Sequence, residues 1–110
     1  MPNLKVYFDE TLLPPDEAAI PRLLTDLRGL LCHDLAVKID ACQLAAIAVK
    51  GLPDQPAVNV ELAYMPGPAR SPDLLRAVAE QIRDRTAETF AGGVAVRMWA
   101  LNSDSYLALK

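Results

Sequence analysis

Hydrophobic and polar residues alternate in the first positions of the chain, which is the pattern of a β-strand with one buried face. Leu4, Val6 and Phe8 are apolar, and Lys5, Tyr7 and Asp9 lie between them. This alternation predicts a strand over residues 3–8. The same period of two returns at 58–64 and at 94–100, where it predicts two further strands.

Between these strands the apolar positions change to the spacing of an amphipathic helix. In the first such stretch they are Ile20, Leu23, Leu24, Leu27, Leu30 and Leu31. We expect a helix over 16–32, with Asp16 as a cap and Pro21 near its first turn. Ser71, Pro72 and Asp73 predict a second helix, because they supply a hydroxyl cap, a proline at the first position and an acid at the positive end. Its apolar positions are Leu75, Val78, Ala79 and Ile82.

Residues 42–49 are apolar except for Gln43. A run of this kind predicts a strand that is either central in a sheet, with both faces covered, or part of a subunit interface. A short strand is also expected over 106–109, at the end of the chain. With these elements, the order strand, helix, strand occurs twice.

This order predicts an α+β fold in a single domain spanning 1–110, with pseudo-repeats at 1–51 and 57–110. The two β-α-β units would form a four-stranded mixed sheet with both helices on one face. Hydrophobic residues make up 52% of the chain and aromatic residues only 5%, so the open face would be rich in alanine and would need a partner. A trimer would bury three such faces, with the 106–109 strands bridging the subunits.

Charge and composition exclude several classes of function. The net charge is -3 and the basic residues are scattered, so nucleic acid is not an expected partner. No apolar run approaches the roughly 20 residues of a membrane span, and there is no secretory signal pattern, so we expect a cytoplasmic protein. Cys32 and Cys42 are able to pair in principle, but in that compartment they are expected as reduced thiols. Neither belongs to a metal-spaced cluster, and no metal or cofactor is expected.

Pro2 is the strongest candidate for chemistry. Removal of the initiator methionine, which is common before a small residue, would expose a secondary amine at the start of the first strand. An α-amino group titrates near about 8, and an apolar pocket or nearby cations lower that pKa, so the amine would be available as a base. While Met1 remains attached, the nitrogen of Pro2 is an amide and is not basic.

Three cations and one aromatic residue are candidates for substrate binding, and Gln43 is a fifth, uncharged candidate. Arg70 lies in the loop before the second helix, where loop amides and the helix N-terminus favour an anion. Lys38 precedes the second strand and Arg97 lies on the last strand, where Trp99 shares its face. A surface ion pair or interface packing is the alternative role for each of them.

These features together resemble the tautomerase superfamily over nearly the whole chain. The resemblance is carried by Met-Pro before a strand, by the double β-α-β unit and by the Ala-Arg-Ser segment at 69–71 that opens the second helix. The length and the Arg-Ser helix start resemble 5-carboxymethyl-2-hydroxymuconate isomerases. Lys38 and residues 94–102 resemble the tautomerases related to macrophage migration inhibitory factor (MIF).

The resemblance implies a MIF-like homotrimer that moves a proton between carbon and oxygen of a 2-hydroxydienoate or 2-keto acid, without a cofactor. Pro2 would carry the proton. Lys38, Arg70 and Arg97 would bind the carboxylate or polarise the carbonyl group of this small-molecule substrate.

Two positions depart from the family pattern. Gln43 stands where the isomerase branch has an arginine, and an amide cannot pair with a carboxylate as a guanidinium does. Ala95 stands where the MIF-like branch has a tyrosine. A non-catalytic trimeric module for binding or interaction is therefore the alternative to an isomerase, and a retained Met1 would favour it. A third alternative is a ferredoxin-like sensor domain, which has the same order of strands and helices.

Overall fold

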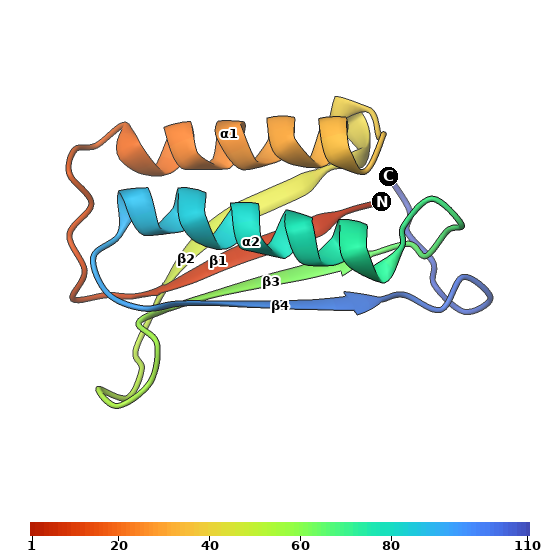
Figure 1. Cartoon of the computed structure of the whole chain (residues 1–110). Coiled ribbons are helices and arrows are strands. Elements are labelled where there is room, and N and C mark those ends of the chain that lie inside the picture. Colours follow the sequence, from red (N-terminus) through yellow and green to blue (C-terminus); the bar gives the residue numbers. More distant parts are fainter.

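The computed structural model describes residues 1–110, and the predicted strands form one mixed sheet in the order β2-β1-β3-β4 (Figure 1). β1 (Asn3–Asp9) pairs in parallel with β2 (Gln43–Val49) and antiparallel with β3 (Val58–Tyr64). β3 in turn pairs in parallel with β4 (Val94–Ala100). The predicted α+β fold with two β-α-β units is confirmed.

Both helices lie on the same face of the sheet, side by side (Figure 1). α1 (Ala19–Asp34) begins three residues later than expected, because the Asp16 carboxylate accepts a hydrogen bond from the Ala18 amide in the preceding turn, at 2.9 Å. Pro21 therefore falls in the first turn, where its missing amide costs no helical hydrogen bond. α2 (Pro72–Thr89) begins as predicted, with the Ser71 hydroxyl accepting from the Leu74 amide at 3.2 Å. Neither helix combines the length and the apolar character needed to cross a membrane.

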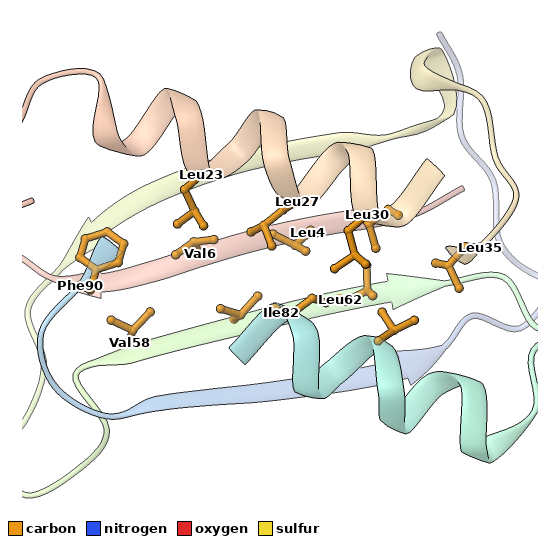
Figure 2. Close-up of a cluster of buried hydrophobic side chains, with 13 residues drawn as sticks. Leu4, Val6, Leu23, Leu27, Leu30, Leu35, Val58, Leu62, Ile82 and Phe90 are labelled. Atoms are coloured by element: carbon orange, nitrogen blue, oxygen red, sulfur yellow. The ribbon is translucent and has the colours of Figure 1, made fainter. Parts of the chain in front are cut away.

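The core lies between the sheet and the two helices (Figure 2). It is built from every second residue of the central strands and from the predicted apolar positions of the helices. The fully enclosed side chains include Leu4, Val6, Val58, Val60, Leu62, Leu27, Leu31, Val78 and Ile82. At one end of the core, the rings of Phe8 and Phe90 stack with their centroids 4.9 Å apart.

The residues that alternate with the core positions form the other face of the sheet, which no element of the chain covers. Across this open face the strand register aligns Lys5, Glu61 and Arg97 in one row. Ile47 is 37% exposed and Trp99 is 46% exposed there. The face therefore combines apolar and charged side chains.

For the strand at 42–49 the central alternative is excluded and the interface alternative stays open, and the strand expected at 106–109 is absent from the single chain. Residues 42–49 do form a strand, but β2 is at an edge of the sheet and not at its centre. An apolar run shows that both faces avoid water, but it does not show whether a second face is to be covered by the same chain or by another. Residues 106–109 form no strand in the single chain.

The ferredoxin-like alternative does not fit this topology. In a split β-α-β fold another strand lies between the two strands that a helix connects. Here β1 and β2 are neighbours, and so are β3 and β4.

Candidate functional site

Pro2 lines a cavity of about 520 Å³ at the end of the sheet where β1 begins. Its side chain is fully buried. The cavity is lined by Met1, Pro2, Asn3, Asp40, Ala41, Cys42, Gln43, Tyr106, Ala108, Leu109 and Lys110. The proline that the sequence singled out thus adjoins a space large enough for a small organic acid.

The parallel register of β1 and β2 brings Gln43 to this cavity. Asn3 pairs with Gln43, so both strands start at the same end of the sheet. The backbone amide of Gln43 donates a hydrogen bond to the carbonyl oxygen of Pro2 at 3.0 Å. The short 3-10 helix η1 (Ile39–Ala41) directly precedes β2 and supplies the rest of this wall.

The last residues of the chain form the opposite wall. After β4 the backbone turns at Asn102, whose carbonyl oxygen accepts from the Tyr106 amide at 2.9 Å. The segment then returns to the start of β1, so that the two termini lie side by side (Figure 1). Lys110 donates from Nζ to the carbonyl oxygen of Asp40 at 3.2 Å, and its Nζ lies 3.3 Å from Sδ of Met1.

The electrostatics at this end of the sheet favour an unprotonated amine. Burial lowers the pKa of the Met1 amino group below its ordinary value, and the positive charges of Arg70 and Lys110 lower it further. Both effects disfavour a protonated amine. Pro2 is the next residue, so an amine created there would be exposed to the same cations.

Arg70 acts on the site through its charge and does not line the cavity. Its guanidinium donates to the carbonyl oxygen of Leu35 at 2.9 Å and to that of Met65. It thereby joins the loop before α2 to the residue that follows α1. Lys38 has an exposed side chain that does not line the cavity, although its carbonyl oxygen accepts from the Ala41 amide at 3.0 Å.

Within one chain, Arg97 and Trp99 are not part of the Pro2 cavity. Arg97 donates to Oδ1 of Asn59 on the neighbouring strand. It also lines a separate cavity of about 460 Å³ between β4 and α2, together with Arg76 and Arg83. Trp99 is on the open face of the sheet. The five residues predicted to bind substrate are therefore not gathered at one place: only Gln43 joins Pro2.

Sequence reasoning missed the wall formed by Tyr106 and Lys110. No local pattern marks these residues, because their position depends on where the turn at Asn102 directs the chain. Lys110 is the only cation among the residues that line the cavity. No group of three or more histidine, cysteine or acidic side chains is arranged to hold a metal ion.

No family model matches the chain, and no curated protein matches it. Solved structures do match it. A fused 4-oxalocrotonate tautomerase (4-OT), solved as an asymmetric trimer, has a TM-score of 0.77 at 11% identity, with 96% of this chain and 91% of that chain covered. The protein Pt0534, solved after inactivation by 2-oxo-3-pentynoate, has a TM-score of 0.78 at 13% identity, with coverage of 94% and 89%. The chain has the fold of the tautomerase superfamily.

A MIF-like protein from Entamoeba histolytica extends the likeness to that branch of the superfamily. Its TM-score is 0.74 at 8% identity, and 97% of this chain and 94% of that chain are covered. Proteins of unknown function also match over nearly the whole chain. The tautomerase fold is therefore shared by neighbours with and without an assigned activity.

Proposed function

We propose that this protein is a cofactor-independent keto-enol tautomerase that acts on a 2-hydroxydienoate or 2-keto acid, with the nitrogen of Pro2 as the base. The observation that carries the proposal is the fully buried Pro2 beside a cavity of about 520 Å³. A similar protein, Pt0534, was inactivated by a 2-oxo acid, which supports this class of substrate.

In the proposed reaction, removal of Met1 leaves Pro2 with a free secondary amine. Burial and the charges of Arg70 and Lys110 lower the pKa of the Met1 amino group, and they would lower the pKa of the adjacent Pro2 amine in the same way, so that it accepts the proton of the 2-hydroxyl group. The electron pair of the broken O–H bond forms the carbonyl group, and the π-electrons shift toward carbon. The same amine then returns the proton to that carbon, so no proton is gained or lost overall.

The cavity lining contains the acidic Asp40 and one basic side chain, Lys110, which we propose as the group that receives an anionic substrate. Lys110 would pair with the substrate carboxylate, and the more distant charge of Arg70 would stabilise the negative charge that develops on oxygen. Gln43 would contribute a neutral hydrogen bond. Because an arginine is absent at that position, we propose a substrate that is bound with one strong ion pair and not two.

We also propose that the protein is a homotrimer. The uncovered sheet face with Ile47 and Trp99 supports an assembly, and the similar fused 4-OT was solved as a trimer. In a trimer, Arg97 and Trp99 would face a neighbouring subunit. We propose that they take part in catalysis only across such an interface.

The proposed function is tested by turnover of phenylpyruvate and 2-hydroxymuconate with untagged protein whose N-terminal processing is known from its intact mass. Pro2→Ala should lower kcat/KM by about 100-fold or more, the usual contribution of a general base. A form with one extra residue between Met1 and Pro2 is the matched control, because it keeps the proline ring and blocks its nitrogen. Unchanged turnover in both forms would exclude Pro2 as the base.

A non-catalytic trimeric module for binding or interaction is the second candidate. The specific observation in its favour is Gln43, which lines the cavity where the isomerase branch has a cation. This alternative predicts a trimer that retains Met1 and isomerises neither substrate.

A further inference from the structure

The only two cysteines of the chain lie against each other beside the Pro2 cavity. Cys32 is in the last turn of α1, and Cys42 lies between η1 and β2. Both are free and half-buried, and their Sγ atoms are 3.8 Å apart. A disulfide bond has an S–S length of about 2.0 Å, so the two sulfurs would have to approach by about 1.8 Å to form one.

Two cavities reach Cys42, and Cys32 is itself only half-buried. Cys42 lines the Pro2 cavity, and it also lines a second cavity of about 200 Å³ on the side of α1. Arg28 lines that second cavity and its positive charge is felt by Cys42. This charge opposes the effect of burial on the pKa of Cys42 but does not outweigh it.

The two thiols have different surroundings, and this difference suggests their order of reaction. Burial raises the pKa of Cys42 to about 11, with a further contribution from the Cys32 thiol. Sγ of Cys42 also donates to the carbonyl oxygen of Lys38 at 3.7 Å. Burial and this hydrogen bond both disfavour the thiolate of Cys42, and we infer that Cys32 is the sulfur that reacts first.

We propose that Cys32 and Cys42 are a reversible redox site that forms a disulfide bond in response to a hydroperoxide. The sulfur of Cys32 attacks the terminal oxygen of the peroxide, the O–O bond breaks, and an alcohol or water leaves. The sulfur of Cys42 then attacks the resulting sulfenic acid, the S–O bond breaks, and water leaves with the proton of Cys42. Two thiols are oxidised and one peroxide is reduced by two electrons, and a small-molecule dithiol reverses the change.

The disulfide would connect α1 to one wall of the Pro2 cavity. Residues 40–43 form that wall, and Lys110 is hydrogen-bonded to the carbonyl oxygen of Asp40 within it. Oxidation would fix this segment against the helix and remove the hydrogen bond from Cys42 to Lys38. The inference goes beyond the proposed function, because the disulfide forms whether or not Pro2 is a catalytic base.

The test is treatment of the reduced, folded protein with hydrogen peroxide, followed by mass spectrometry. We expect single chains, not cross-linked to one another, that are lighter by two hydrogen atoms. Their mass should return to its original value after treatment with dithiothreitol. Trypsin cleaves after Lys38, between the two cysteines, so peptides 29–38 and 39–50 should be found joined. With only two cysteines in the chain, this product has a single interpretation.

Two variants separate the roles of the sulfurs. Cys42→Ser should accumulate a sulfenic acid on Cys32 that dimedone traps, and Cys32→Ser should react at least about tenfold more slowly because the remaining thiol is protonated. Disulfides only between chains, or independent oxidation of both sulfurs in the wild-type protein, would overturn the proposal. The presence or absence of the disulfide within one wild-type chain decides whether the proposal holds, even if a variant fails to fold.

Discussion

At the scale of single residues, the proposed chemistry depends on the protonation state of one nitrogen, that of Pro2. Pro2 is fully buried, and its surroundings at the start of β1 include the charges of Arg70 and Lys110. Each of these cations makes a protonated amine less favourable. Arg70 and Lys110 are therefore proposed to lower the pKa of the base, and Lys110 is also the proposed ligand for the substrate.

Replacement of Lys110 tests this double role. In Lys110→Gln the pKa of the Pro2 amine should rise, because a nearby positive charge is lost, and the increase of kcat/KM with pH should move to higher pH. KM should also rise about tenfold, since a charged hydrogen bond to the substrate contributes roughly 1.5 kcal/mol. The measurement is a pH profile of both kinetic parameters.

Lys50→Gln is the matched control for that experiment. Lys50 is a lysine of the same charge whose side chain is 88% exposed and lies near Glu10, outside the Pro2 cavity. Its replacement should leave the pH profile and KM unchanged. Equal effects of the two substitutions would mean that only the net charge of the protein matters.

At the scale of elements, the helices hold the sheet through a small number of enclosed side chains. Leu27 lies at the centre of α1 and is fully buried against the strands (Figure 2). Truncating a leucine in such a place loses its apolar contacts and leaves a cavity. The position of α1 matters for the site as well, because Leu35 and Cys32 at its end adjoin Arg70 and Cys42.

Leu27→Ala should therefore lower the free energy of unfolding by about 2–5 kcal/mol. Leu13→Ala should change it by less than about 0.5 kcal/mol, because Leu13 is 89% exposed. Urea denaturation of both variants measures the difference. Similar losses in the two variants would contradict the described core.

Most elements are predictable from the sequence because their patterns depend on short-range spacing. The strands at 58–64 and 94–100 and the apolar face of α1 follow directly from such spacing. The edge position of β2 does not, since it depends on which strand pairs with β1. The wall formed by Tyr106 and Lys110 also escapes prediction, because it results from one turn at Asn102 and not from a repeated pattern.

At the scale of the whole molecule, the open face of the sheet is the feature that a single chain leaves unexplained. A thin domain with one helical layer buries only one side of its sheet. Ile47 and Trp99 on the other side are partly exposed. An assembly of three chains would cover this face and bring Arg97 to a neighbouring subunit.

Replacement of Trp99 by glutamate tests the assembly. Trp99→Glu should convert the proposed trimer to a monomer, because a charge cannot be buried in an apolar interface without a partner. Leu52→Glu is the control, since Leu52 is 66% exposed in the loop between β2 and β3. Sedimentation velocity gives the mass of both variants. A trimeric Trp99→Glu protein would show that this face is not the interface.

The most direct test of the central claim is covalent labelling of the N-terminus with 2-oxo-3-pentynoate, followed by intact-mass and peptide analysis. Trypsin releases the first peptide after Lys5, so a label on Pro2 is easily assigned. We expect a chain that has lost Met1 and carries one label on the peptide 2–5, with turnover lost in proportion to labelling. A chain that retains Met1, or a label elsewhere with Pro2 unmodified, would contradict the claim that Pro2 is the catalytic base.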